Sequence, residues 1–328
     1  MSSPDARTAQ KTRQAVVIGS AGQDGRILSA DLEADGYDVV RIERSGIRLS
    51  DGSIRPYDIR VADNALTLFE HGAPDEIYYL AAHHHSSEQG TAELAPLLEE
   101  SFAVHCFGLM HILDAIASSK NATRLFYASS SLIFGQPDSS PQNEATPPRP
   151  MCAYGVTKTA GMGICDLYRR ERNLFCCSGI LFNHESPHRG SQFVSKKIVS
   201  SAVDIHLGVR DHLELGSLDA QVDWGAAADY VRAMRLILQL ESPQDFVIAT
   251  GQPHSVMEFA QLAFAELGMD YSKHVRVQPQ LVRRPLRKAA LVGDTTNLRL
   301  ATGWFPRMTF GDMIKDMVRA ELASRHAI

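Results

Sequence analysis

A glycine-rich turn directly after a short apolar run is the feature that most constrains how this chain can fold. Residues 15–18 (AVVI) are apolar and mostly β-branched, which is typical of a strand buried on both faces. GSAGQDG follows and spaces Gly19, Gly22 and Gly25 three residues apart, and residues 23–35 then carry a helical apolar pattern. A strand, a glycine turn and a helix in this order predict the first unit of a dinucleotide-binding α/β fold.

Strand-like and helix-like segments continue to alternate along the chain. Strands are predicted near 37–43, 76–82, 124–130 and 176–182, and helices near 95–118 and 153–172. This alternation predicts an α/β fold, a Rossmann-type doubly wound parallel sheet with helices on both faces. We assign that domain to residues 14–182 with returning segments near 220–252, and a smaller C-terminal α/β substrate lobe to residues 183–328. Residues 1–13 are polar and aperiodic, and we expect a disordered tail.

Composition and charge exclude several classes of function. A formal charge of -5 and a pI near 6.2 give no basic field for a nucleic-acid backbone, so we expect no nucleic-acid partner. The N-terminus lacks an apolar signal region, and no run approaches the roughly 18 apolar residues of a membrane span. The five cysteines have no CxxC spacing and are expected to be reduced. We therefore expect a cytoplasmic protein without a membrane partner.

Other residues near the predicted strand ends are candidates for cofactor binding. Glu43 follows the second strand, where a carboxylate can hold both ribose hydroxyls and select NAD, whereas Arg44 beside it can pair with the 2'-phosphate of NADP. We favour NAD and keep NADP open. Asp58 and Ile59 are expected to end a third strand and to cap the adenine. The dinucleotide site also includes Gln23, Asp24, Leu80, Ala81 and Ala82.

Tyr154 and Lys158 are the candidate catalytic pair. Their YxxxK spacing places both side chains on one face of a helix. A cation beside a phenol stabilises the phenolate and is expected to lower the pKa of Tyr154, which would make it a general base toward a substrate hydroxyl. Lys158 would also hold the nicotinamide ribose. Ser130, at the end of a predicted strand, would orient that hydroxyl.

These motifs resemble the extended short-chain dehydrogenase/reductase family, and the downstream sequence is similar to the GDP-mannose 4,6-dehydratases. The resemblance lies in GSAGQDG, in ILFNHESPHRG followed by FVSKKI, in LELGSLDAQVDWGAAADYV and in DFVIATGQPHSV. It implies an NAD(P)-dependent enzyme acting on a GDP-sugar, commonly as a homodimer or homotetramer. It also implies substrate-binding roles for His85, Ser131, Asn183, Glu185, Arg189, Lys197 and Arg284, with Arg284 holding phosphate and Lys197 near the nucleotide.

Several positions depart from that family pattern. The family places a glutamate, the acid/base of the elimination step, where this chain has Leu132. Leucine cannot move a proton, and loss of a general base costs about a hundredfold to ten-thousandfold in rate. Val222 and Arg287 replace an expected arginine and glutamate, and HHHSS at 83–87 keeps only His85 in register. Three adjacent histidines diverge from one another, so we expect no metal site.

The resulting hypothesis is an oxidoreductase that acts at C4 of a GDP-sugar of the mannose or heptose type, as a dehydrogenase, 4-ketoreductase or 4-epimerase. One alternative keeps 4,6-dehydratase activity, with His83, His84 or Ser131 replacing the missing acid/base. Another alternative is a non-catalytic nucleotide-binding subunit, against which the intact Ser130, Tyr154 and Lys158 argue.

Overall fold

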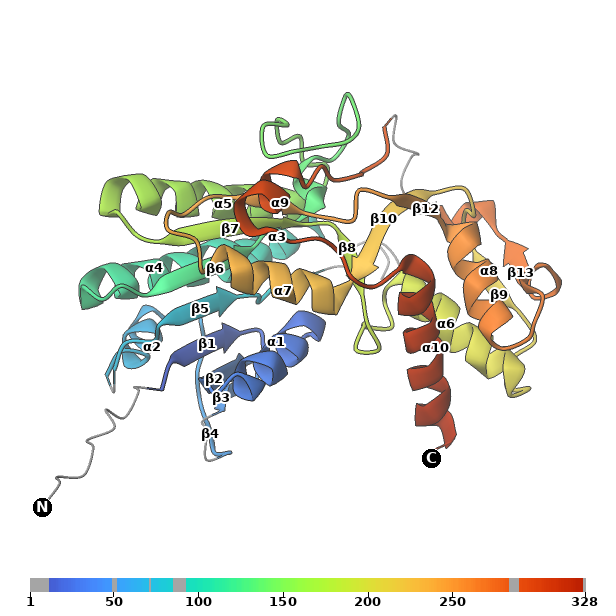
Figure 1. Cartoon of the computed structure of the whole chain (residues 1–328), viewed down its shortest axis with the longest axis horizontal. Coiled ribbons are helices and arrows are strands. Elements are labelled where there is room, and N and C mark those ends of the chain that lie inside the picture. The colour runs from blue at the N-terminus through green and yellow to red at the C-terminus, as the bar shows by residue number, and fades with distance from the viewer. Residues whose placement is uncertain (1–11, 49–51, 71, 85–92, 283–288, 327–328) are drawn as a thin grey trace, which may run out of the picture.

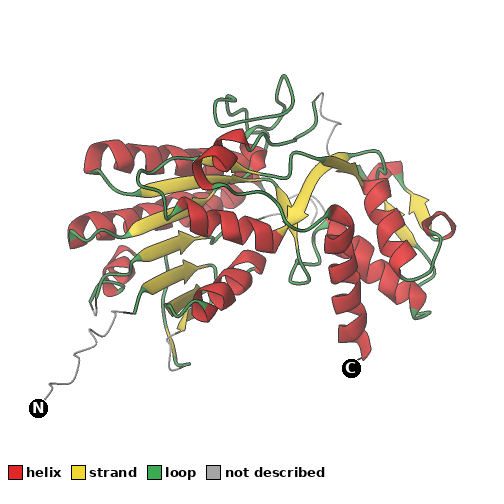
Figure 2. Cartoon of the chain, viewed as in Figure 1, coloured by secondary structure: helices red, strands yellow, loops and turns green. Residues whose placement is uncertain are grey.

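The computed structural model describes residues 12–48, 52–70, 72–84, 93–282 and 289–326. A large lobe built on a wide sheet adjoins a smaller, mainly helical lobe (Figures 1 and 2). The chain crosses between the lobes more than once, and the two lobes meet beside the C-terminal ends of the large sheet.

The large lobe is organised by an eight-stranded sheet with the order β11-β7-β6-β5-β1-β2-β3-β4. Pairing is parallel from β11 to β2, whereas β3 and β4 add antiparallel strands at one edge. The chain order reverses between β1 and β5, and ligands of such sheets bind at this switch point. The strands are β1 (Gln14–Ile18), β2 (Asp38–Glu43), β3 (Gly46–Arg48), β4 (Ile54–Arg55), β5 (Glu76–Tyr79), β6 (Arg124–Ala128), β7 (Cys176–Leu181) and β11 (Phe246–Ile248).

Helices cover both faces of this sheet, which confirms the doubly wound prediction (Figure 1). Alternate residues of each strand point to opposite faces, and they enter two separate cores. Val17 packs in the core that includes Leu28 and Met234, whereas Val16 packs in the core that includes Leu113 and Cys165. The first face carries α1 (Gln23–Ala34) and α7 (Ala227–Ile237), and the second carries α2 (Ala62–Thr67), α3 (Leu94–Phe102), α4 (Gly108–Ser119) and α5 (Ala153–Arg172).

The smaller lobe has a core of its own, to which Ile198, Phe259 and Ile314 contribute. Its elements are α6 (Val194–His206), α8 (Val256–Glu266), α10 (Phe310–His326), the paired strands β9 (Leu213–Leu215) and β13 (Val275–Val277), and the 3-10 turns η4 (Tyr271–Lys273) and η5 (Pro279–Leu281). A three-stranded sheet joins the lobes and consists of β8 (Asn183–Glu185), β10 (Gln221–Ala226) and β12 (Pro253–Ser255). The short α9 (Thr296–Thr302) returns to pack beside β11.

The helix predicted over 95–118 contains a wider turn in its middle. A π-helical turn, η2 (Ala103–Phe107), separates α3 from α4, and such turns are frequent at functional sites. By length and composition alone the stretch Leu94–Ser119 could cross a membrane. Half of its most apolar window is buried inside the fold, as is usual for a helix that covers a sheet.

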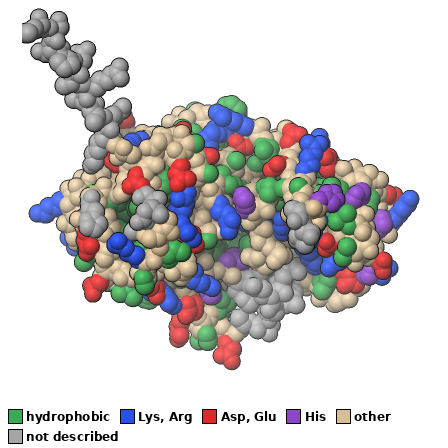
Figure 3. All heavy atoms as spheres, turned by 90° about the horizontal axis from the view of Figure 1, so that it is seen from below, with side chains coloured by type: hydrophobic (Ala, Val, Ile, Leu, Met, Phe, Trp, Pro, Cys, Tyr) green, Lys and Arg blue, Asp and Glu red, His purple; other side chains and the backbone are tan. Residues whose placement is uncertain are grey.

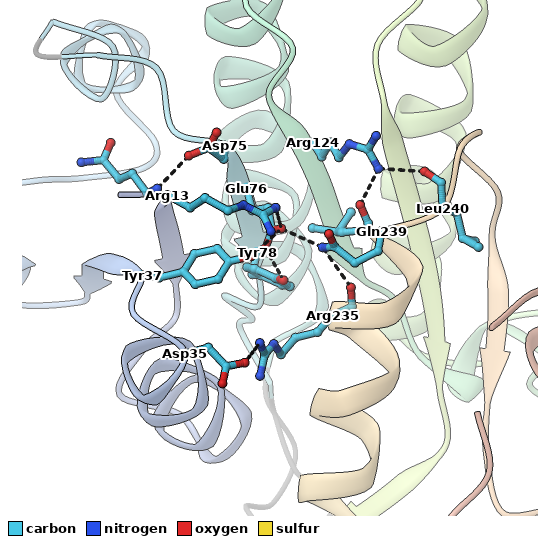
Figure 4. Close-up of polar contacts among 12 residues, drawn as sticks. Arg13, Asp35, Tyr37, Asp75, Glu76, Tyr78, Arg124, Arg235, Gln239 and Leu240 are labelled. Atoms are coloured by element: carbon cyan, nitrogen blue, oxygen red, sulfur yellow. Dashed lines mark hydrogen bonds and ion pairs between the residues drawn. The ribbon is translucent and has the colours of Figure 1, made fainter. Parts of the chain in front are cut away.

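A buried carboxylate at the opposite end of the sheet ties the start of the fold to the segment just after α7 (Figure 4). Glu76 is 1% exposed and accepts hydrogen bonds from the hydroxyls of Tyr37 and Tyr78 at 3.2 and 2.6 Å and from Gln239 at 2.8 Å. Arg13 supplies the countercharge at 2.5 Å. Residue 13 therefore contacts the folded lobe, although the sequence pattern placed it in the tail; residues 1–11 lie outside the described ranges.

Charged side chains of both signs are intermixed on the face seen from below (Figure 3). This distribution accords with the small formal charge of -5, which favours local rather than global recognition of anions.

Candidate active site

The glycine turn between β1 and α1 is packed against two neighbouring strand ends. Gly19 has a left-handed φ of 95°, and a Cβ there would lie 2.7 Å from the backbone nitrogen of Ala81, which follows β5. A Cβ on Gly25 would lie 2.4 Å from the carbonyl oxygen of Gly19. Gly22 caps α1 and brings no side chain to its first-turn N–H groups. This helix N-terminus therefore fits an anion such as the diphosphate of a dinucleotide.

The loop after β2 lies beside that glycine turn because the carbonyl of Ile42 accepts the N–H groups of Gly19 and Ser20 at 2.8 and 3.1 Å. Glu43 ends β2, with its carboxylate 3.6 Å from Arg48 and 3.4 Å from the hydroxyl of Ser45. Arg44 is exposed. Glu43 and Arg44, which are predicted to contact the ribose, are therefore near the predicted diphosphate position.

The predicted third strand ending at Asp58 and Ile59 is wrong. The chain reverses at Gly46, which has a φ of 135°, and then forms the antiparallel strands β3 and β4. Asp58 follows in a turn, where both of its carboxylate oxygens accept bonds from Arg60 at 2.8 to 3.1 Å. That hydrogen bonding holds the pKa of Asp58 below its usual value.

A cleft of ≈ 400 Å³ opens between the carboxyl ends of the sheet and the joining strands β8 and β10. Predicted residues from distant parts of the sequence meet there. The lining includes Asp24, Leu80, Ala82, Ser130, Ser131, Leu132, Tyr154, Lys158, Asn183 and Arg189, together with His84, His184, Phe193, Gln221, Val222 and Asp223.

Ser130, Tyr154 and Lys158 face this cleft from two elements. Ser130 follows β6 and caps the 3-10 turn η3 (Ser131–Ile133), its hydroxyl accepting the N–H of Leu132 at 3.2 Å. Tyr154 and Lys158 lie in the first two turns of α5. The ammonium nitrogen of Lys158 donates to the carbonyl of Ala128 at 2.7 Å and lies 5.6 Å from the centre of the Tyr154 ring. The YxxxK spacing therefore brings the pair together as predicted.

The electrostatics of this pair differ from the sequence prediction. Burial raises the pKa of Tyr154 above its ordinary value, although Arg189 acts in the opposite direction. Burial also lowers the pKa of Lys158 to about 7. Desolvation disfavours the charged form of both groups, and for Tyr154 it outweighs the lowering of the pKa by Arg189. The expected lowering of the tyrosine pKa is therefore wrong, and Tyr154 is a phenol.

His105 is a buried residue at this site that sequence reasoning did not single out. It lies in the π-helical turn, and its Nε2 accepts the N–H of His83 at 2.9 Å, so its Nδ1 carries the proton that faces the hydroxyl of Thr157 at 2.7 Å. Burial holds its pKa far below the ordinary value, so the ring is neutral. The imidazole meets the Tyr154 ring edge-on at 5.2 Å. His105 thus joins the loop after β5 to the helix that carries Tyr154.

Two of the three consecutive histidines can be described. His84 lines the cleft, and its ring lies 5.0 Å from that of Tyr154 and 5.1 Å from that of Phe193. His83 is held through its backbone to His105. Within the described residues no group of histidine, cysteine and acidic side chains could hold a metal ion.

Among the described residues two carboxylates line the cleft, and both are engaged. Asp24 faces the Nε2 of His184 at 2.9 Å. Asp223 accepts the N–H groups of Thr250, Gly251 and Gly293 at 2.9 to 3.1 Å and the Thr250 hydroxyl at 2.5 Å. Asp223 therefore anchors three chain segments at one wall of the cleft.

Residues of NHESPHRG divide between the cleft and the interior. Asn183 is exposed and Arg189 half-buried at the cleft, whereas Glu185 is buried and pairs with Arg189 at 2.9 Å. Burial raises the pKa of Glu185, an effect that Arg189 opposes. Lys197 lies on α6 and is not among the described residues that line the cleft. His85, Arg284 and Arg287 fall outside the described ranges.

The sequence matches the family model described as GDP-mannose 4,6 dehydratase over residues 16–317. GDP-mannose 4,6 dehydratase 2 of Caenorhabditis elegans is 36% identical, with 97% of this chain and 91% of that protein covered. GDP-mannose 4,6 dehydratase of Homo sapiens is 33% identical, with 98% and 94% covered.

Solved structures share the architecture at lower identity. The RMD protein of Pseudomonas aeruginosa, solved with NADPH, superposes with a TM-score of 0.81 at 20% identity, covering 95% of this chain and 98% of that one. UDP-glucose 4-epimerase of Thermus thermophilus, solved with NAD, gives 0.76 at 22% identity, covering 96% and 100%. The extended match to the family model and to relatives above 30% identity shows that this chain belongs to the GDP-mannose 4,6-dehydratase family of short-chain dehydrogenases/reductases.

Proposed function

We propose that this chain is an NAD(P)-dependent oxidoreductase that acts at C4 of a nucleotide sugar of the GDP-mannose or GDP-heptose type and does not eliminate water. The observation that carries the proposal is a contrast within one 3-10 turn. Ser130 offers a hydroxyl to the cleft, while Leu132, two residues later, offers only hydrocarbon where the family has its acid/base glutamate. Oxidation or reduction at C4 needs the first residue and not the second.

The other carboxylates at the cleft support the loss of elimination. A general base that removes a proton from carbon needs an available lone pair within reach of that proton. Asp24 is held by His184, and Asp223 accepts four hydrogen bonds. Asp223 cannot replace the missing glutamate without breaking these contacts. Asp24 is stabilised as a carboxylate by His184 and Arg189, and its lowered pKa makes it a weak base.

The remaining groups suit a redox step. The Ser130 hydroxyl orients the oxygen on C4, and the Tyr154 hydroxyl exchanges a proton with that oxygen. When bound, NAD(P)H supplies the hydride for C4, and its oxidised form accepts a hydride in the reverse reaction. Burial raises the pKa of Tyr154, so the residue is a phenol that can donate its proton to the C4 oxygen in the reductive direction.

The cofactor and the assembly are further parts of the proposal. Glu43 beside the glycine turn favours NAD, and exposed Arg44 leaves NADP open. We propose a homodimer or homotetramer that buries the exposed apolar side chains of Phe107, Val156 and Leu167 on the π-helical turn and α5. The five cysteines are free thiols, which accords with the reducing cytoplasm.

Turnover assays test this function directly. The purified chain is incubated with GDP-mannose and NAD or NADP, and with the corresponding 4-keto sugar nucleotide and NADH or NADPH, while nicotinamide absorbance and product mass are followed. A dehydrogenase or ketoreductase should change the nicotinamide absorbance and give a product that differs by two hydrogens. A 4-epimerase should give an isomer of unchanged mass without a net change in nicotinamide absorbance. A product lighter by one water contradicts the proposal.

One observation favours a second candidate, a dehydratase with a substitute acid/base. His84 lines the cleft in contact with the Tyr154 ring, whereas His83 is not among the described lining residues. If water is lost, His84→Ala should abolish the loss and His83→Ala should retain it. Elimination that survives in His84→Ala excludes His84 from this role.

A further inference from the structure

We infer that His184 is a positioning residue that, with Asp24, locks the substrate-facing segment to the dinucleotide turn, so that the two ligands bind cooperatively. The identity of the ligands rests on the proposed function, but the lock itself rests on contacts between two segments 160 residues apart in sequence. One segment is the first turn of α1, beside the glycine turn. The other is β8 and the three residues after it.

The His184 ring is fixed at both nitrogens by oxygen atoms. Its Nδ1 lies 2.7 Å from the carbonyl of Phe182, which can only accept a hydrogen bond, and its Nε2 lies 2.9 Å from Oδ2 of Asp24. A neutral ring would point a lone pair at one of these acceptors. With Asp24 as a carboxylate, both contacts are hydrogen bonds only if the ring is an imidazolium. The ring also stacks on Tyr230 of α7 at 4.6 Å, which leaves it little freedom to turn.

A second set of bonds joins the same two segments. The Gln23 amide donates to the carbonyl of His184 at 2.9 Å, and its oxygen accepts the Ser186 hydroxyl at 2.9 Å. Ser186 in turn accepts the N–H of His188 at 3.2 Å. Two adjacent side chains at the start of α1 thus fix the path of the chain from His184 to His188.

This path determines where the substrate-facing groups stand. On β8, His184 is buried against Asp24 and Tyr230, while its neighbour Asn183 is exposed at the cleft. Arg189 comes directly after the held segment and faces the same cleft. β8 also pairs in parallel with β10, whose residues Gln221 to Asp223 form another part of the wall. Movement of Asp24 would therefore be transmitted to Asn183 and Arg189.

The charges around the pair agree with this arrangement. Burial acts to lower the pKa of His184, but the charge of Asp24 and its hydrogen bond outweigh burial and raise it. Burial acts to raise the pKa of Asp24, but His184 and Arg189 outweigh burial, and the pKa is lowered. Asp24 is thus a carboxylate between two cations, and it couples the turn expected to hold a diphosphate to the residues expected to hold a sugar nucleotide.

Cooperative binding follows from the cost of ordering the shared segment. A ligand on the glycine turn orders α1 and, through the lock, β8, so a second ligand at β8 has less ordering to overcome. The coupling must be reciprocal, and couplings of this kind are typically about 5- to 150-fold in affinity. Without His184 the two segments should order independently, and the two affinities should become independent of one another.

Calorimetric titration with GDP, with and without saturating NAD or NADP, tests the inference. In the wild type we expect the saturating dinucleotide to lower the Kd of GDP at least fivefold. The ratio of the Kd of GDP without the dinucleotide to that with it measures the coupling. In His184→Ala and in Asp24→Ala this ratio should fall to about one, and the double variant should be no worse than either single variant. Asp24→Asn should retain part of the coupling because an amide N–H can donate to a neutral imidazole. Gln221→Ala, at the cleft but outside the lock, should change GDP affinity and leave the ratio unaltered.

The outcomes separate the inference from the proposed function. If the wild type binds neither GDP nor a nicotinamide dinucleotide, the proposed function fails. If it binds both and the ratio is near one, or if His184→Ala keeps the wild-type ratio, the positioning role is wrong while the proposed function stands. Should His184→Ala not fold, His184→Gln keeps an amide donor toward Asp24 and serves in its place; it should then show a ratio between one and the wild-type value, and an unchanged ratio overturns the inference.

Discussion

Replacement of Lys158 by methionine should stabilise the ligand-free chain while it removes a candidate catalytic group. The lysine side chain is 1% exposed, and burial lowers its pKa from the ordinary 10.5 to about 7. A difference of this size corresponds to about 5 kcal/mol, of which about 4 kcal/mol still opposes folding at pH 7. Methionine fills a similar volume but leaves the carbonyl of Ala128 without its donor, which costs about 1–3 kcal/mol. The net expectation is a gain of about 1–3 kcal/mol.

The shifted pKa of Lys158 also predicts how the stability difference between the two proteins changes with pH. The folded chain releases the Lys158 proton near pH 7 and the unfolded chain only near 10.5, so the unfolded wild type binds more protons between these values and its stability rises with pH. The advantage of Lys158→Met should be full below pH 7 and shrink toward pH 10.5. Thermal unfolding of both proteins across this range measures it, with an expected increase in Tm of roughly 1.5–4.5 °C at pH 7.

A matched control distinguishes this effect from a general benefit of methionine. Lys315 is an exposed lysine on α10, and Lys315→Met should change Tm little and equally at every pH. A Lys158→Met variant less stable than the wild type at pH 7, or one whose advantage does not change with pH, would refute the reasoning.

Four further outcomes are expected. Tyr154→Phe should lower C4 oxidoreduction by about a hundredfold to ten-thousandfold with an unchanged thermal midpoint, since it removes only the transferred proton. Gly25→Ala should abolish dinucleotide binding in calorimetry, because its Cβ would lie 2.4 Å from a backbone oxygen. Arg13→Ala should lower urea stability by about 1–2 kcal/mol, less than the loss of a fully buried partner, because Arg13 is 45% exposed and Glu76 keeps three neutral donors. His184→Gln should be less stable than the wild type below the ordinary histidine pKa of 6.5, and this difference should disappear as pH rises through the raised pKa of His184.

The parallel part of the fold could be predicted from the sequence because its signals are local and strong. The apolar run before Gly19, the helical period after it, and the same alternation up to Leu181 each describe one element, and the structure places strands and helices at the predicted positions. The YxxxK spacing fixes Tyr154 and Lys158 within one helix, so their approach needed no knowledge of the tertiary structure.

Interactions between distant segments could not be predicted in this way. His105 reaches the site through a π-helical turn, which rotates the side chains that follow it. The spacing of apolar residues in the sequence does not reveal this turn. The bond between Asp24 and His184 joins residues whose sequence neighbourhoods suggest separate roles. The rise in the pKa of Tyr154 depends on how completely the fold buries it, which residue spacing does not specify.

The departures from the family pattern leave the family's scaffold intact. Membership in the family therefore does not by itself mean that the chain catalyses the family's reaction. The glycine turn, the Ser130, Tyr154 and Lys158 group and the strands that line the cleft depend on many residues, and they are retained over nearly the whole chain. Elimination depends on one ionisable side chain whose replacement, Leu132, still packs against the main core. A change at such a position costs the fold little, whereas loss of a general base typically costs about a hundredfold to ten-thousandfold in rate. Identity of 33–36% to dehydratases therefore supports the binding of a nucleotide sugar more strongly than it supports dehydration.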